Sequence, residues 1–217
     1  MPVSQSFALK NRVLLGTLVV LLAMILLAGG WSIPFHYESF SMLYKFGKLK
    51  LYLRYGKVLG ITIALLLFFQ VLLASRVKIL VQIFSAKSAL MLHRINGFII
   101  ACLILVHPVL IKASENFTPY TFGKKYYPEF VGISLFFVLS TLSVTAIFRS
   151  FFRMDYNRWR LLHRLGATTA LLIIPFHVLF VSDTFKSVGV PREAAIVVFS
   201  LNILFIAYIW FKRFFQK

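Results

Sequence analysis

Histidine is the residue type in this sequence whose spacing is best suited to chemistry. Five histidines occur, and four of them form two pairs with the same separation of 14 residues: His93 with His107, and His163 with His177. On an α-helix, 14 residues rise about 21 Å and complete nearly four turns. The two histidines of each pair therefore lie near one face of a helix, one toward each end.

The helices that position these pairs are predicted to span a membrane. Of the 217 residues, 60% are hydrophobic and only 14% are charged, and the mean hydropathy is +0.86. Apolar runs of about 18 or more residues are long enough to cross a bilayer as helices. The sequence predicts an all-α membrane protein, a six-helix transmembrane bundle forming a single domain over residues 1–217. The predicted spans are 13–31, 58–74, 89–111, 130–148, 159–181 and 194–211.

If the third and fifth spans are neighbours, the predicted topology brings the histidines together by depth. The third and fifth spans are separated by one helix, so they run parallel. His93 and His163 are each fifth in their span, and His107 and His177 are each nineteenth. Two neutral imidazoles facing each other across a gap suit the axial ligation of an iron porphyrin. The pattern predicts two b-type haems, one held by His93 and His163 and one by His107 and His177, with the irons about 20 Å apart.

The residues around the first histidine of each pair repeat. Residues 92–97 and 162–166 share a Leu-His-Arg-aliphatic core followed closely by glycine. Arg94 and Arg164 are predicted to bind the cofactor by pairing with haem propionates. Gly97 and Gly166 are predicted to let the flat macrocycle approach the backbone.

Other interpretations of the histidines remain open. They could be polar residues satisfied by packing, or they could carry protons in a haem-free transporter. A zinc site is disfavoured because the members of each pair are about 21 Å apart and have no cysteine or carboxylate beside them. His36 is interpreted as an ordinary residue of the first outer loop.

Charge predicts the orientation and the surroundings of the chain. The net charge of +18 reflects positively charged loops and contact with membrane lipid rather than nucleic acid. With both termini cytoplasmic, the inner side has one acid, Asp155, beside 14 basic residues: Lys10, Arg12, Arg76, Lys78, Lys87, Arg94, Arg149, Arg153, Arg158, Arg160, Arg164, Lys212, Arg213 and Lys217. The outer side has the other ten basic residues and five acids: Glu38, Glu115, Glu129, Asp183 and Glu193.

These motifs resemble the ferric reductase transmembrane family. That family includes ferric reductases, the NADPH oxidases and the haem-bearing membrane subunit of the bacterial periplasmic methionine sulfoxide reductase system. The resemblance runs from about Tyr55 to Lys217. It rests on the segments from His93-Arg94 to His107-Pro108 and from Trp159 to Arg164, and on His177. It implies that His93 and His163 hold the inner haem and that His107 and His177 hold the outer haem.

The resemblance also implies a function, transmembrane electron transfer. Many relatives continue into a flavin- and NADPH-binding domain, whereas this sequence stops at Lys217 and has no Gly-rich dinucleotide fingerprint. We therefore expect no flavin or nicotinamide site, and an oxidoreductase component that needs a separate donor, either a flavoprotein reductase or quinol. Ferric chelates, dioxygen or a redox protein are the expected acceptors, in a plasma or bacterial inner membrane. The alternatives are a quinol-linked cytochrome b, in which the paired helices lie further apart in sequence, and a haem-free transporter or membrane anchor.

Overall fold

The computed structural model describes residues 3–75 and 77–215, and no strand occurs in those residues. The predicted all-α fold is confirmed. The helices are α1 (Val3–His36), α2 (Gly47–Ala74), α3 (Lys78–Phe84), α4 (Ala86–Ser114), α5 (Tyr127–Ile147), α6 (Tyr156–Val181), α7 (Asp183–Lys186) and α8 (Val190–Phe215), with 3-10 turns at Met42–Tyr44 and Lys124–Tyr126.

Six of these helices are long and apolar enough to cross a membrane: α1, α2, α4, α5, α6 and α8. All six predicted spans are therefore present, and each helix is longer than its predicted span because polar end turns continue it. The helix start that differs most is that of α2, which was predicted at Val58 and lies at Gly47. His36 ends α1 rather than lying in a loop.

Two short helices were not predicted from the sequence. The first, α3, follows α2 directly, and Ser85 separates it from α4 with a backbone φ of 60°. This left-handed conformation breaks the helix, and the Ser85 side chain accepts a hydrogen bond from the Ser88 N–H at 3.2 Å. The second, α7, follows the end of α6. Neither helix was predicted, because each is too short to show the periodic spacing of apolar residues by which a helix is detected in a sequence.

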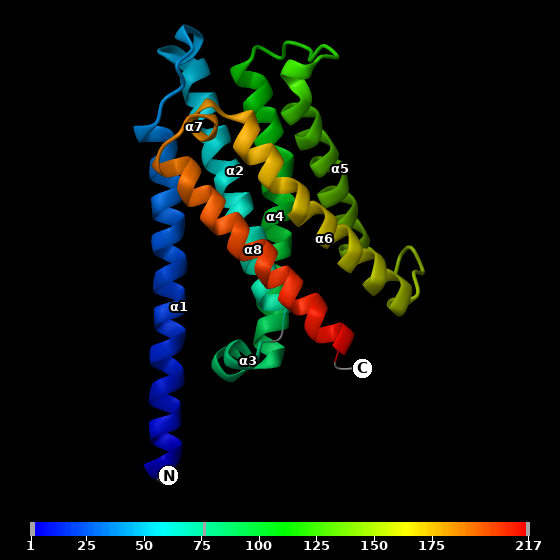
Figure 1. The fold of residues 1–217 in the computed structure, drawn as a ribbon. Coiled ribbons are helices and arrows are strands. Elements are labelled where there is room, and N and C mark those ends of the chain that lie inside the picture. Colours follow the sequence, from blue (N-terminus) through cyan, green and yellow to red (C-terminus); the bar gives the residue numbers. More distant parts are fainter. Residues whose placement is uncertain (1–2, 76, 216–217) are drawn as a thin grey trace.

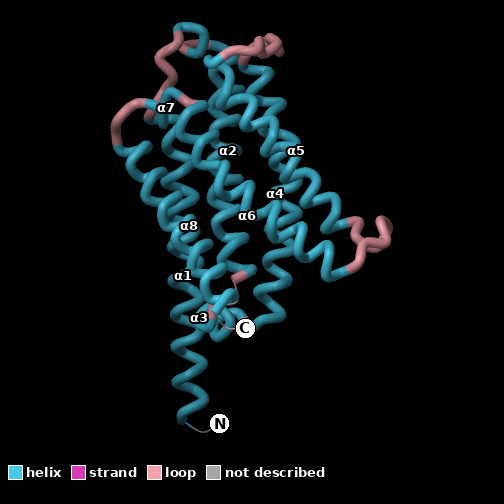
Figure 2. The backbone as a smooth tube through the Cα atoms, turned by 45° about the vertical axis from the view of Figure 1, so that its right-hand side comes forward, coloured by secondary structure: helices cyan, strands magenta, loops and turns pink. Residues whose placement is uncertain are grey.

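The spanning helices alternate in direction, so the bundle has two distinct ends (Figure 1). The α3 end holds α3, the 148–155 loop, the start of α1 and the finish of α8. The α7 end holds α7, the 37–46 segment and the 115–126 segment, and Figure 2 shows these connections gathered at opposite ends of the helices.

The helices pack in two main antiparallel pairs. The most extensive contacts are between α2 and α4, followed by those between α5 and α6, whereas α4 and α6 have little or no direct backbone contact. The buried apolar cluster takes its side chains from α2, α4, α5, α6 and α8. In the α2–α4 pair, a Cβ on Gly56 would lie 2.6 Å from Ile111 Cδ1. The close approach of these two helices therefore requires a glycine, as in many membrane helix pairs.

The two ends also differ in how their acidic residues are used. At the α7 end, Glu38 pairs with Lys50 at 3.0 Å and with Arg54, and Glu115 pairs with Lys112 at 3.1 Å. The hydrogen bond from Lys50 lowers the pKa of the Glu38 carboxyl. At the α3 end, Asp155 caps α6 by accepting hydrogen bonds from the N–H groups of Asn157 and Arg158.

Asp155 makes these capping bonds and no ion pair with a basic side chain within the described residues. Of the basic residues counted for the predicted orientation, the side chains of Lys10, Arg12, Arg76, Arg213 and Lys217 lie outside the described residues.

Candidate haem-binding site

The four histidines lie on two helices that begin in the same way. His93 and His107 are on α4, and His163 and His177 are on α6. The N-cap residue of each helix precedes the first histidine by eight residues, and in each helix the cap side chain accepts a backbone hydrogen bond. A fixed distance from cap to ligand places the two histidines of each helix at matching depths.

The structure brings the histidines together across the two helices. Both α4 and α6 run from the α3 end to the α7 end (Figure 1). His93 and His163 lie near enough to influence each other electrostatically, and so do His107 and His177. Helix α4 packs on α2, and helix α6 packs on α5. At each depth, one histidine therefore comes from the α2–α4 pair and the other from the α5–α6 pair.

The two histidines at the α7 end share one local arrangement. The His107 Nδ1–H donates to the carbonyl of Gly56 at 2.9 Å, and the His177 Nδ1–H donates to the carbonyl of Pro128 at 2.8 Å. A carbonyl oxygen can only accept, so each Nδ1 carries the hydrogen and each Nε2 keeps a free lone pair. This is the tautomer that a metal-ligating histidine needs.

A glycine stands against each of these two imidazole rings. A Cβ on Gly60 would lie 2.9 Å from His107 Cε1, and a Cβ on Gly132 would lie 2.5 Å from His177 Cε1. Each glycine comes four residues, about one turn, after the carbonyl that fixes its ring. The backbone of α2 thus supplies an acceptor and a flat surface for His107, and the backbone of α5 supplies both for His177.

At the α3 end, a polar network between α2 and α4 surrounds His93. Gln70 donates from its side-chain amide to the His93 carbonyl at 2.9 Å. Asn96 donates to the Gln70 side-chain oxygen at 2.7 Å and to the Leu66 carbonyl at 2.9 Å. The His93 Nδ1–H reaches the Gln70 carbonyl at 3.3 Å. These bonds hold the His93 segment of α4 against α2.

His163 is the exception among the four. Its Nδ1 is buried and has no hydrogen-bond partner among the described residues. The nearest aromatic side chain, Trp159, is one turn earlier on α6, with 5.2 Å between the ring centroids. Packing therefore positions the His163 ring, without the backbone acceptor that serves the other three.

The prediction for Gly97 and Gly166 is wrong. A Cβ on Gly97 would lie 3.0 Å from Gln70 Nε2, and a Cβ on Gly166 would lie 2.9 Å from Leu142 Cδ2. These glycines let α4 approach α2 and let α6 approach α5. Helix packing, rather than a flat cofactor, is what they accommodate.

The arginines beside the first histidines stay apart from carboxylates in the described part of the chain. Arg94 is exposed and Arg164 is half-buried. The charge of Arg94 acts on His93. Pairing of either arginine with a propionate remains a prediction.

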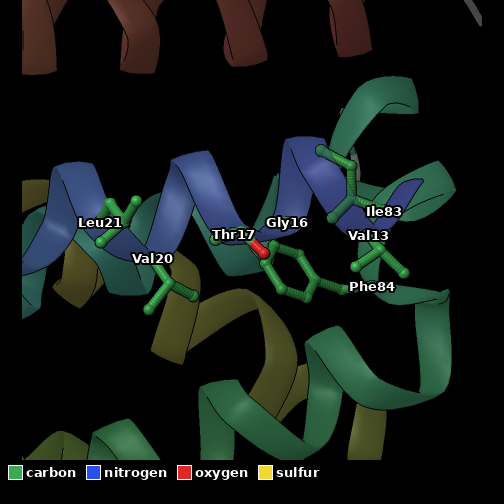
Figure 3. A pocket seen from close by; sticks show the side chains of 7 residues that line it. All are labelled: Val13, Gly16, Thr17, Val20, Leu21, Ile83 and Phe84. Atoms are coloured by element: carbon green, nitrogen blue, oxygen red, sulfur yellow. The ribbon is translucent and has the colours of Figure 1, made fainter. Parts of the chain in front are cut away.

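An apolar groove of about 600 Å³ lies elsewhere, between α1 and α3. Its lining comes from Val13, Gly16, Thr17, Val20 and Leu21 of α1 and from Ile83 and Phe84 of α3, and the Phe84 ring lies beside Gly16 and Thr17 (Figure 3). None of these side chains is a good ligand for iron, so the groove is separate from the histidine site. No group of three or more His, Cys, Asp or Glu within residues 3–75 and 77–215 could hold a bare metal ion.

Sequence reasoning overlooked the residues that orient the histidines: Gly60, Gly132, Gln70 and the carbonyl groups of Gly56 and Pro128. Two signals were present. Gly56 and Gly60 form a small-residue repeat at a spacing of four, and Gln70 is a lone amide in an apolar span, where polar residues usually face the interior of the bundle.

The Gln70 network gives a prediction about stability. We expect Gln70→Leu to lower the free energy of unfolding by about 0.6–1.7 kcal/mol, the range measured for hydrogen bonds between membrane helices. The matched control is Gln82→Leu, because Gln82 is exposed on α3. Thermal unfolding in detergent micelles measures both variants, and equal midpoints for the two would contradict the role of Gln70.

A comparison with known families gives one match. Residues 59–174 match the family model of the ferric reductase like transmembrane component. The match covers more than half of the 217 residues, and the chain belongs to this family of multi-pass membrane proteins. The matched region includes His93, His107 and His163 and ends three residues before His177. No curated protein and no solved structure matches the chain.

Proposed function

We propose that this chain transfers electrons across the membrane with two b-type haems, one held by His93 and His163 at the α3 end and one by His107 and His177 at the α7 end. The proposal is supported by the placement of these histidines at two depths on α4 and α6, where the two at each depth lie near enough to influence each other electrostatically. For three of them, a carbonyl acceptor at Nδ1 leaves Nε2 available for iron. Membership of the family suggests the same function.

The residues present fit this cofactor. A porphyrin supplies four nitrogen ligands of its own, so each iron needs only two protein ligands, and each depth offers two imidazoles. When bound, the haems would supply one-electron carriers at two depths of the membrane. His93 with His163 and His107 with His177 would hold the haems, and two imidazoles at each iron would leave no open site for dioxygen or another small ligand.

The ends of the bundle suggest the direction of transfer. The α3 end has many basic residues and Asp155 as its only acid, so we assign it to the cytoplasm. The donor at that end is a separate flavoprotein reductase or quinol, and the acceptor at the α7 end is a ferric chelate, dioxygen or a redox protein. The membrane is a plasma membrane or a bacterial inner membrane.

Haem content tests the proposal directly. The chain purified in detergent should contain two haem b per polypeptide, as measured by extraction and by a reduced-minus-oxidised spectrum. Both haems should be low-spin, and the reduced protein should not bind carbon monoxide. A folded preparation without haem would refute the proposal and favour a haem-free transporter or anchor.

The donor is tested in vesicles that contain the haem-loaded protein. A short-chain quinol and, separately, a flavin reductase with NADH and FMN are added, and haem reduction is followed by absorbance. Reduction by the flavin system supports the ferric reductase-like assignment. Reduction by quinol alone supports the quinol-linked alternative.

A further inference from the structure

The four candidate ligands differ in the hydrogen bond made by the ring nitrogen that faces away from iron. At the α7 end, both Nδ1–H groups donate to carbonyl oxygens at short distance, 2.9 Å for His107 and 2.8 Å for His177. At the α3 end, His93 has a longer bond of 3.3 Å. His163 has no partner among the described residues, although its Nδ1 is buried. The two ends therefore differ in the hydrogen bonding of the histidine Nδ1 atoms, which affects how strongly each imidazole donates electrons to a metal.

The helix register shows which acceptor His163 lacks. The carbonyls that serve His107 and His93 belong to Gly56 and Gln70, which are 14 residues apart on α2, as the histidines are on α4. The same antiparallel register on α5, counted from Pro128, places Leu142 opposite His163. The Leu142 carbonyl instead accepts from the Thr145 hydroxyl at 3.3 Å.

A hydrogen bond at Nδ1 changes the electron donation of an imidazole to its metal. When the Nδ1–H donates to a carbonyl, the ring becomes a more basic ligand. A more basic ligand stabilises ferric iron relative to ferrous iron and so lowers the reduction potential of a haem. Two short bonds at the α7 end should thus favour the oxidised state there.

Nearby charges act in the same direction. The positive charge of Arg94 acts on His93 at the α3 end, and a positive charge near iron favours the ferrous state. At the α7 end, the half-buried Lys57 donates to the Thr184 hydroxyl at 3.0 Å. The carboxylate of Asp183 offsets its charge.

We propose that the haem at the α3 end has the higher midpoint potential, because His163 lacks the backbone acceptor that the ligands of the α7 end possess. A net hydrogen bond changes an equilibrium by roughly three- to tenfold. With one bond missing and one long, we expect an electron to favour the α3 end by about tenfold, or about 59 mV for one electron. This inference rests on the proposed function.

Potentiometric titration of single-haem variants tests the order. His107→Ala should leave only the haem at the α3 end, and His93→Ala should leave only the haem at the α7 end. Each variant is titrated against redox mediators and followed at its α-band. The haem left in His107→Ala should have the higher midpoint. Equal midpoints, or the reverse order, would overturn the inference.

A milder variant of the whole chain keeps the test decisive if a single-haem variant does not fold. In Gly60→Ala, the new Cβ would press on His107 and lengthen its bond to Gly56, so the lower of the two midpoints should rise while the upper stays. Gly29→Ala is the control, because no atom lies within 4 Å of its Cβ. A shift of the upper midpoint alone would overturn the inference. A chain that binds no haem would refute the proposed function instead.

Discussion

His107→Ala combined with His177→Ala should remove one haem, whereas His107→Ala combined with His163→Ala should remove both. In the proposed arrangement, two histidines at one depth serve the same iron, so the second loss at that depth removes no further haem. Two histidines at different depths serve different irons. Haem content per polypeptide, measured by extraction, distinguishes one haem from none.

The fifth histidine supplies the control for these double variants. His36 is exposed at the end of α1, where its ring nitrogen bonds to the Ser32 carbonyl one turn earlier. His36→Ala should retain both haems. If the same-depth and cross-depth double variants kept equal amounts of haem, the assignment of the pairs would be wrong.

Gly132→Ala should weaken haem binding at the α7 end without changing either ligand. A Cβ at this position would lie 2.5 Å from Cε1 and 2.8 Å from Nδ1 of His177. The bond to Pro128 holds this ring, so the ring moves only if that bond is lost. Changes of this kind around a metal ligand cost roughly 10–100-fold in affinity.

Haem titration of the apoprotein measures this effect. One of the two binding phases should weaken, and the other should match the unaltered chain. Gly29→Ala again serves as the control, since its Cβ would meet no atom within 4 Å. Two unchanged phases in Gly132→Ala would show that the ring has room to move, and that Gly132 does not determine its position.

The sequence predicted the features that depend on one helix at a time. The six spans follow from apolar runs, and the depths of His93, His107, His163 and His177 follow from a constant rise per residue. Both signals are local. The pairing of the histidines by depth needed only one further fact: a single span separates the third span from the fifth, so these two spans run in the same direction.

The features that were missed depend on register between helices. Which carbonyl of α2 faces His107, or which glycine of α5 faces His177, is determined by packing and leaves no periodic trace in the sequence. Gly97 and Gly166 were misinterpreted for the same reason. The sequence does not indicate whether a glycine near a histidine faces the cofactor or a neighbouring helix. Two of the missed features had a readable signal: the polarity of Gln70, and the spacing of four between Gly56 and Gly60.

The two antiparallel helix pairs have a consequence for biogenesis. His93 and His107 are oriented by backbone groups of α2, and His177 by a backbone group of α5. Each pair is made of spans that follow one another along the chain, so each can form as a hairpin once it has been inserted in the bilayer. Orientation of these three rings is then complete before the hairpins associate. Under the proposed function, cofactor insertion can be the last step of maturation, into a protein in which His93, His107 and His177 already have the tautomer that iron needs.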